Sequence, residues 1–357
     1  MSSANSETAH IPQVRLNLTA RLLRASAILL ALLVIAVIFS AGLGAVTVPM
    51  SEVAKITVNH LPIIGRAVHF SVPAEVDSIV WEFHIPRMLL AALVGLSLAV
   101  AGAALQGLLL NPLADPYMIG VSSGAAVGAG IGVILGIQGW MMGFGIPLLA
   151  FVFALIAVSV VYGLAMRAGK VSVLSFLLAG VVVGSFMWAV LTFLMTFSSE
   201  NLETIVFWTM GSFAGSDPWG RVLVVLPFAV VGSFVLYAYA RDLNLFALGE
   251  ESARHLGIET ESLKRKLIAA TALLTAAAVS VSGTIGFVGL MVPHITRRLV
   301  GPDHRILIPC SALLGALMMI AADTVARTAM APGEIPVGII TALLGAPFFL
   351  YLLRRTS

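Results

Sequence analysis

Residues 241–266, RDLNLFALGEESARHLGIETESLKRK, decide the fold because they form a polar island between long apolar runs. Ten of these 26 residues are charged, whereas Asp, Glu, Lys and Arg make up only 10% of the whole chain. Apolar residues interleave with the charges, and Gly249 and Gly257 interrupt them, which predicts short amphipathic helices broken at glycine. We therefore expect this segment to lie in water between membrane spans, as a surface that a partner holds.

The composition supports a membrane protein with many spans. Hydrophobic residues make up 59% of the chain and the mean hydropathy is +1.04, whereas soluble domains carry roughly 25% charged residues. The net charge is only +3. The basic residues are spread in a way that sets membrane topology, so we expect membrane lipid around the chain and no nucleic-acid partner.

The apolar runs predict ten transmembrane helices. A helix needs about 20 apolar residues to cross the roughly 30 Å hydrocarbon layer. One rod over the 34 residues 267–300 would be about 51 Å long, so we expect this stretch to turn near Gly283, Gly286 and Gly289. The predicted spans lie near 25–47, 87–109, 118–137, 143–166, 172–197, 221–240, 267–285, 286–300, 306–329 and 335–353.

The distribution of basic residues favours ten spans with both termini in the cytoplasm. Fifteen Lys and Arg then lie inside and five outside, as the positive-inside rule predicts. A single span over 267–300 would move five arginines outside. We therefore predict a cytoplasmic tail over 1–24 and one transmembrane domain over 25–355. Its coupling segment, residues 241–266, separates two groups of four spans in the layout of an inverted repeat.

Two polar sites interrupt the apolar sequence. Asp115, followed by Pro116, predicts a helix cap before the third span. Asn111 and Leu113 lie in the same turn and are candidates for a constriction at the cytoplasmic mouth of a pathway.

Asp323 and Arg327 are four residues apart in the ninth span and share one helix face. They form either an internal ion pair or a site where Arg327 faces an acidic partner outside. Glu334, in the stretch PGEIP, is expected at the outer edge, as a cap of the tenth span.

Two segments between spans are long enough to fold on the outer side. Residues 49–82 contain proline and glycine among mixed residues, which predicts a folded outer loop. Residues 198–220 combine acids with Trp208 and Trp219, which indicates either an aromatic belt at the headgroup level or a short helix that lines an outer vestibule.

The sequence lacks several chemical signatures. It contains no G-x-x-x-x-G-K-[ST] phosphate-binding loop and no cluster of His, Cys and carboxylates for a metal site or catalysis. The spans also lack the several unpaired carboxylates typical of ion-coupled carriers. The chain is therefore expected to form a pathway, with no catalytic residues and no cofactor of its own.

Ordered motifs run through nearly the whole chain, from about residue 24 to residue 355. They resemble the FecCD-like permease subunits of type II ABC importers, which take up cobalamin, ferric siderophores or haem. The matching stretches are HIPR (84–87), GAALQGLLLNPLADPYMIGVSSGAAVG (102–128), LLAGVVVG (177–184), ALGEESARHLGI (247–258), GTIGFVGLMVPHITRRLVGPDHR (283–305), ADTVAR (322–327) and PGEIPVGIITALLGAPFFLYLL (332–353).

The resemblance implies an all-α subunit of ten helices with the type II ABC importer permease fold, which works as a homodimer. It also implies two cytoplasmic ABC ATPase subunits, which bind ATP and Mg²⁺, and a periplasmic or lipid-anchored substrate-binding protein. The location implied is the bacterial cytoplasmic (inner) membrane.

The resemblance also implies roles for particular residues. His84, Arg87 and Arg327 fall on positions that dock the binding protein, although His84 stands where an arginine is common. Asn111 and Leu113 fall on one gate, and Val173 and Leu174 at the start of the fifth span fall on a second. The positions that couple to the ATPase are Leu248, Gly249, Glu250, Ala253, Leu256 and Gly257.

The predicted function is import of a bulky metal chelate, driven by a separate ATPase. A ferric siderophore or haem is favoured because iron chelates are frequent cargoes of the family, and cobalamin is the alternative. The fifth and tenth spans and residues 198–220 are expected to line the pathway. A carrier driven by an ion gradient and a non-transporting membrane scaffold are the alternatives from other classes.

Overall fold

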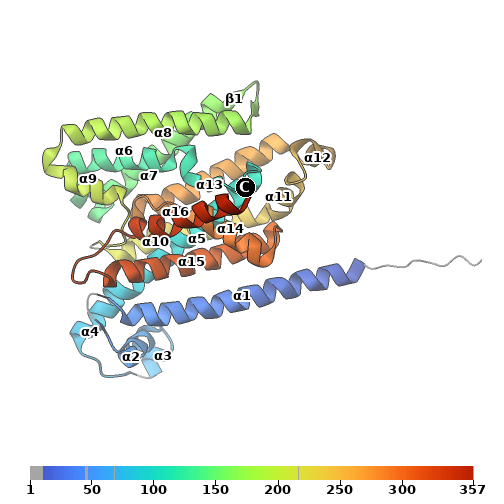
Figure 1. Cartoon of the computed structure of the whole chain (residues 1–357). Helices are drawn as coiled ribbons and strands as arrows, with labels where there is room; N and C mark the ends of the chain where they lie inside the picture. Colours follow the sequence, from blue (N-terminus) through green and yellow to red (C-terminus); the bar gives the residue numbers. More distant parts are fainter. Residues whose placement is uncertain (1–10, 45–46, 68, 216, 357) are drawn as a thin grey trace, which may run out of the picture.

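The computed structural model describes residues 11–44, 47–67, 69–215 and 217–356 as a bundle of long helices with a small helical group beside one end (Figure 1). Residues 1–10 of the predicted tail lie outside this range, and the rest of that tail belongs to the first helix.

The structure is almost entirely helical. Its α-helices are α1 (Ile11–Gly42), α2 (Met50–His60), α3 (Ile64–Ala67), α4 (Ala74–Ser78), α5 (Ile85–Leu108), α6 (Val121–Ile134), α7 (Gly145–Ala165), α8 (Val173–Thr196), α9 (Leu202–Thr209), α10 (Pro218–Ala238), α11 (Ala240–Phe246), α12 (Glu250–His255), α13 (Thr260–Ser282), α14 (Val288–Val300), α15 (His304–Thr328) and α16 (Val337–Thr356). The remaining elements are the π-helix η1 (Ile79–His84), the 3₁₀-helices η2 (Pro116–Ile119), η3 (Ile137–Gly143) and η4 (Ser199–Asn201), and the antiparallel strands β1 (Met166–Arg167) and β2 (Lys170–Val171).

Each of the ten predicted spans coincides with helical structure. Among the described residues, seven helices are long and apolar enough to cross a membrane: the Ala20–Gly42 part of α1, the continuous helix Ala74–Leu108, and α7, α8, α10, α13 and α15. The third predicted span differs from a straight rod, because α6 and η3 are bent by 105°. The tenth corresponds to the shorter apolar helix Val337–Leu352 within α16, and the eighth to α14, which has 13 residues and carries Arg297 and Arg298 in its last turn.

The stretch 267–300 forms two helices, as predicted. Helix α13 ends at Ser282 and α14 begins at Val288. Gly283 has a φ of +68°, a conformation that glycine adopts without a steric penalty. Neighbouring groups satisfy the backbone of the break, since Ser212 N–H donates to Ser282 O at 2.8 Å and Ile285 N–H donates to the Tyr117 hydroxyl at 2.8 Å. Irregular backbone is tolerated at membrane depth only with such partners.

Helix α5 lies at the centre of the bundle, and every residue from 97 to 108 is buried. Its glycines allow other backbones to touch it. A Cβ at Gly95 would lie 2.2 Å from Gly315 O on α15, and one at Gly102 would lie 1.8 Å from Gly289 O on α14. Small residues at these contacts give the close helix packing typical of membrane proteins.

Residues 49–82 fold, as predicted. Helices α2 to α4 and η1 enclose a small core that includes Val53, Ile56 and Val80, and the His60 ring stacks on Trp81 at 4.0 Å. Residues 198–220 contain the short helix α9, which fits the helix alternative predicted for them. Trp219 joins both regions, since its Nε1–H donates to Trp81 O at 2.8 Å.

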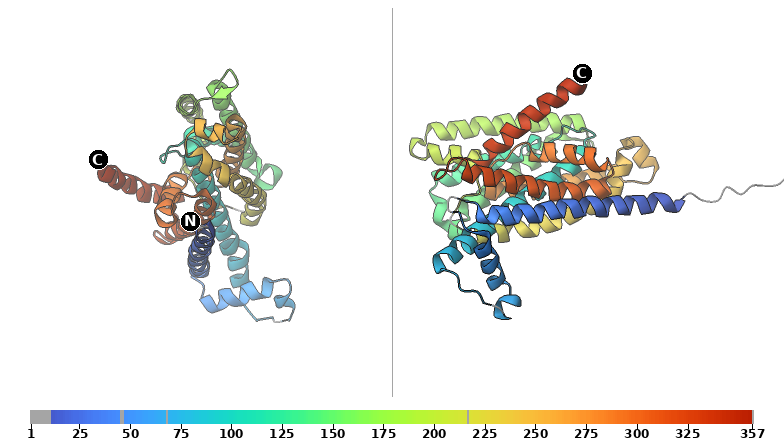
Figure 2. Two further views of the ribbon diagram at one scale, coloured as in Figure 1. Left: turned by 90° about the vertical axis from the view of Figure 1, so that its right-hand side faces the viewer. Right: turned by 60° about the horizontal axis from the view of Figure 1, so that its bottom comes forward.

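The two ends of the bundle carry different elements. The hairpin β1–β2, helices α11 and α12, and the C-terminal end of α16 lie at one end in Figure 1, and the start of α1 points the same way. Helices α2, α3, α4 and α9 lie at the other end. In both views of Figure 2 the end of α16 projects away from the rest of the bundle.

Candidate functional site

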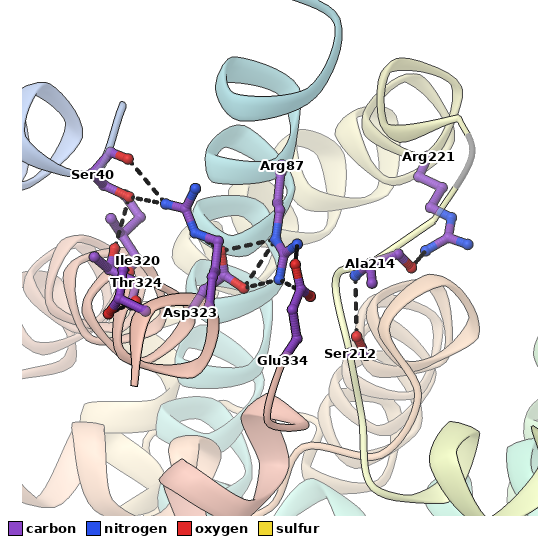
Figure 3. Close-up of polar contacts among 11 residues, drawn as sticks. Ser40, Arg87, Ser212, Ala214, Arg221, Ile320, Asp323, Thr324 and Glu334 are labelled. Carbon is purple, nitrogen blue, oxygen red and sulfur yellow. Dashed lines mark hydrogen bonds and ion pairs between the residues drawn. The ribbon is translucent and has the colours of Figure 1, made fainter. Parts of the chain in front are cut away.

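A charged network joins three helices near the end of the bundle that carries α2 to α4 (Figure 3). Arg87, near the start of α5, donates from Nε and Nη2 to the Asp323 carboxylate of α15 at 2.9 to 3.2 Å. The same guanidinium donates from Nη1 and Nη2 to Glu334, before α16, at 2.9 and 3.0 Å. One arginine therefore holds two carboxylates from distant parts of the chain.

Arg327 completes the network. Its Nε lies 3.3 Å from Asp323 Oδ2, so the predicted ion pair is present. Its Nη2 donates to Ser40 O at 3.0 Å and Ser40 Oγ at 2.7 Å, which ties α1 to α15. The exposed fractions are only 1% for Asp323 and 2% for Arg327. A docking role for Arg327 therefore requires this buried side chain to become accessible.

The three residues predicted to dock a binding protein surround one pocket. His84, Arg87, Arg327 and Glu334 line a cavity of about 170 Å³, together with residues 213–215. The His84 ring is almost buried, with Nδ1 at 2.9 Å from Ala41 O. Glu334 was expected to cap the tenth span, and this expectation is wrong: its carboxylate binds Arg87, and α16 begins three residues later.

One predicted gate pair lies in the turn that leads into η2, and the other begins α8, which packs on η2. Asn111 and Leu113 form the turn after α5, where Asn111 Oδ1 accepts from Leu113 N–H at 2.9 Å. Val173 and Leu174 begin α8, and Leu174 is 67% exposed. Helix α8 packs directly on η2, because a Cβ at Gly180 would lie 2.1 Å from Met118 O.

Asp115 acts as predicted, as a helix cap between the gate turn and α6. Its Oδ1 accepts from Tyr117 N–H at 2.9 Å at the start of η2. The cap orients Tyr117, whose hydroxyl accepts from Ile285 N–H in the break between α13 and α14. The turn that carries Asn111 and Leu113 is thus joined to the irregular backbone of the bundle interior.

A cleft of about 500 Å³ runs along α8. Gly180, Gly184 and Trp188 form one wall, and the hydroxyl groups of other residues give the cleft a mixed polar and apolar lining. The fifth predicted span and residues 198–220, both expected to line the pathway, contribute residues to this cleft. No residue of the tenth predicted span is among the described residues that line the cleft. The other lining residues are Tyr117, Met118, Ser122, Ser123, Val181, Ser185, Thr209 and Thr284.

The coupling segment folds as α11, α12 and the first two turns of α13. Gly249 and Gly257 separate these helices with φ values of +104° and +89°, where other residues are strained. Leu248 and Leu256 are 65% and 58% exposed, whereas Ala253 is buried. Two apolar side chains therefore project from the surface while Ala253 packs beneath it.

Glu250 points into the protein. Its carboxylate accepts from Lys264 Nζ at 2.8 Å and from Arg254 Nη2 at 3.3 Å. Lys264 is buried, and it also donates to Glu261 Oε1 and to Val171 O, both at 3.0 Å. Sequence reasoning missed Lys264, because a lysine in a charged segment is normally solvated and its partner Val171 is 93 residues away.

A second contact ties the coupling segment to α15. Asn244 Nδ2 donates to Asp303 Oδ1 at 2.7 Å, and Asn244 Oδ1 accepts from His304 N–H at 2.8 Å. Arg305 donates to the Asp303 carboxylate from its side chain and its backbone N–H, and these hydrogen bonds lower the pKa of Asp303 to about 2. This contact has no local sequence signal.

The polar clusters are ion pairs and caps. Among the residues that the structure describes, no three His, Cys, Asp or Glu side chains lie close enough together to hold a metal ion. The described structure therefore has ion pairs toward both ends of the bundle.

Comparisons with known proteins agree with this architecture. A family model described as the FecCD transport family matches residues 32–355. The chain is 50% identical over 286 residues to a cobalamin import system permease protein of Halobacterium salinarum, which covers 80% of this chain and 76% of that protein. It is 40% identical to a hemin transport system permease protein of Yersinia pestis, over 77% of this chain and 83% of that one.

A solved structure shares the fold. It is described as an inward-facing conformation of a metal-chelate type ABC transporter, and its sequence is 32% identical. The superposition has a TM-score of 0.79 and covers 93% of this chain and 99% of the other.

Proposed function

Because the chain belongs to the FecCD transport family, we propose that it is the membrane-spanning subunit of an ABC importer that moves a bulky metal chelate into the cytoplasm. The observation that carries the proposal is the coupling segment. It presents Leu248 and Leu256 on a surface of short helices at one end of a bundle of membrane-spanning helices. Such a surface fits a partner that supplies the energy for transport.

The proposed complex contains two copies of this chain, two cytoplasmic ATPase subunits and one substrate-binding protein. The binding protein docks at the end with α2 to α4, where Arg87 and Glu334 are partly exposed beside their pocket. The ATPases dock at the opposite end. Both termini lie on the ATPase side, in the cytoplasmic membrane of a bacterium.

The cargo follows the cleft along α8. Its lining combines hydroxyl groups with Gly180, Gly184 and apolar side chains, so it offers weak contacts rather than a tight site. Weak binding favours passage over trapping, and the binding protein supplies the affinity. Asn111, Leu113, Val173 and Leu174 close the pathway toward the cytoplasm.

Two cargoes follow from different observations. The relative that is 50% identical is named for cobalamin, and the relative that is 40% identical is named for hemin. We propose a bulky metal chelate as the class, with cobalamin supported by the first relative and haem by the second. A ferric siderophore, which the sequence analysis also favoured, belongs to the same class.

Reconstitution tests this proposal. The chain is placed in proteoliposomes with its partner ATPase, and binding proteins loaded with cobalamin, haem or a ferric siderophore are added outside. We expect one loaded binding protein to stimulate ATP hydrolysis and drive uptake that requires ATP inside the vesicles. The control is the same complex with a hydrolysis-deficient ATPase. Uptake that runs on an ion gradient without ATP, or no uptake of any chelate, would contradict the proposal.

A further inference from the structure

Lys264 connects three separate parts of the chain. Its ammonium donates to Glu250 Oε2 of α12 at 2.8 Å, to Glu261 Oε1 on its own helix at 3.0 Å, and to Val171 O of strand β2 at 3.0 Å. An ammonium has three hydrogen-bond donors, and each has one of these acceptors. The side chain is only 5% exposed, so water does not replace a lost partner easily.

Val171 is held on both of its backbone polar groups. Its carbonyl accepts from Lys264, and its N–H donates to Glu261 Oε2 at 2.9 Å. Two hydrogen bonds therefore join the hairpin β1–β2 to the start of α13. Because Val171 is itself buried, this contact is part of the packed structure.

The hairpin leads directly into the predicted gate. Ser172, which follows Val171, caps α8 by accepting from Ser175 N–H, and α8 begins at Val173. One residue therefore separates the anchored strand from Val173 and Leu174. Displacement of β2 must displace the first turn of α8, because the intervening backbone is too short to absorb it.

Through Glu250, Lys264 also contacts α12, which belongs to the surface proposed to face the ATPase. Glu250 is the first residue of α12, between Leu248 and Leu256, the two exposed apolar side chains of that surface. Lys264 is only 5% exposed, whereas Glu250 is 34% exposed, so loss of Glu250 would leave a buried ammonium with one acceptor fewer, which is unfavourable. Helix α12, α13 and the hairpin are therefore expected to move together rather than separate.

We propose that Lys264 is a positioning residue that transmits the displacement of α12 to the start of α8, and so couples the ATPase to the gate. This role rests on the proposed function. Lys264 does not touch the cargo or the ATPase, and it acts through Glu250 on one side and through Val171 on the other.

The test compares Lys264→Met with Lys170→Met in the complete reconstituted complex. Methionine has a similar length and no charge. Lys170 lies in the same hairpin and is exposed, so it controls for the chemical change. Three quantities are measured: ATPase retained on purification, cargo moved per ATP hydrolysed, and the nucleotide-dependent change in distance between spin labels at Leu178→Cys of two protomers. Cys310→Ala removes the native cysteine.

We expect Lys264→Met to retain the ATPase while the cargo moved per ATP falls about tenfold, within the range typical of coupling between sites. The nucleotide-dependent change at position 178 is expected to disappear. Lys170→Met is expected to behave like the parent. The proposal would be overturned if Lys264→Met kept both the parent's amount of cargo moved per ATP and its nucleotide-dependent change in spin-label distance. A loss of ATPase binding as large as the loss of uptake would also overturn it, because Lys264 would then only stabilise the structure.

Glu261→Gln provides a second variant if Lys264→Met does not fold. It weakens the hold on Val171 while Lys264 keeps Glu250, so the same loss of coupling is expected, and normal coupling would overturn the role. A parent complex without ATP-dependent uptake would overturn the proposed function and this role with it. A functional parent with a fully coupled Lys264→Met would overturn the role alone.

Discussion

Arg87 shows how single residues hold this membrane protein together. Its guanidinium binds Asp323 and Glu334, and Asp323 in turn binds Arg327. Two arginines and two carboxylates balance in charge, which matters most for Asp323 and Arg327, 1% and 2% exposed, because an unpaired buried ion is costly. The network joins α1, α5, α15 and the segment before α16, so it also fixes the pocket beside His84.

Asp323→Asn is expected to lower the free energy of unfolding by about 3–5 kcal/mol. The change leaves Arg87 and Arg327 buried with a neutral neighbour in place of their shared carboxylate. Thermal unfolding of the purified protein in detergent measures the effect. Glu334→Gln is the matched control, since Glu334 is 33% exposed and water can compensate. Equal effects of the two substitutions would contradict this account.

Asp303 gives a prediction on pH. The pKa of its carboxyl is lowered from 3.8 to about 2 by hydrogen bonds from Arg305 and Asn244. A lowered pKa contributes stability that is present above about pH 4 and is lost as the pH falls through about 2.

Asp303→Asn is therefore expected to lower the free energy of unfolding by about 1–2 kcal/mol at pH 7. The difference from the parent is expected to stay constant down to about pH 4.5 and to shrink at lower pH. Unfolding curves of both proteins across this range provide the measurement. A difference in the free energy of unfolding that grows as the pH falls would contradict this prediction.

At the scale of elements, α5 works as the central helix because its glycines admit other backbones. Gly102 lies against Gly289 of α14, and Gly95 lies against Gly315 of α15. Small residues let helices approach where lipid offers no hydrophobic driving force between them. The broken region between α13 and α14 then reaches partners that satisfy its backbone.

Gly102→Val is expected to destabilise the protein by about 1–3 kcal/mol or more, because overpacking forces α5 and α14 apart. Gly163→Val is the control: Gly163 lies on α7 with no atom within 4 Å of an added Cβ. The midpoint of thermal unfolding is compared for both variants. The packing account fails if Gly163→Val is as destabilised as Gly102→Val.

Helices α11 and α12 give a prediction on binding. Leu256→Asp places a charge on an apolar side chain that is 58% exposed, so we expect the ATPase to dissociate from the complex on purification. Leu61→Asp is the control, because Leu61 is 41% exposed and directly follows α2, which lies at the other end of the bundle from α12 in Figure 1. Normal recovery of the ATPase with Leu256→Asp would remove this residue from the docking surface.

At the scale of the whole molecule, two loops lie on the same side of the membrane when an even number of spans separates them. Ten spans place the hairpin β1–β2 and the loop between α14 and α15 together, and place the loop before α4 opposite them. A single span over 267–300 would move residue 302 to the other side. The two topologies therefore differ in the side of every segment after residue 300, and the loop at residue 302 is one of these that is open to labelling.

Cysteines introduced at exposed positions test this topology in a Cys310→Ala background. We expect a membrane-impermeant thiol reagent to label Lys170→Cys and Pro302→Cys only in inside-out vesicles. Ser71→Cys is expected to react only in right-side-out vesicles. Labelling of Pro302→Cys from the same side as Ser71→Cys would refute ten spans.

The sequence by itself determined the place of the long apolar helices, the break near Gly283, the cap at Asp115 and the Asp323–Arg327 pair. Each depends on composition or on neighbours within a few residues, such as the length of an apolar run, a glycine at positive φ, or one turn of a helix. The gate and coupling positions, which the family motifs imply, stay predictions.

Only the tertiary structure decided which polar groups meet. Arg87 binds Glu334 across 247 residues, and Lys264 binds Val171 across 93. The local pattern had given Glu334 to a helix cap, and the family motif had given Glu250 to the contact with the ATPase. In the folded chain both carboxylates turn toward buried cations, because a charge shielded from water must find its partner wherever the packing of helices places one.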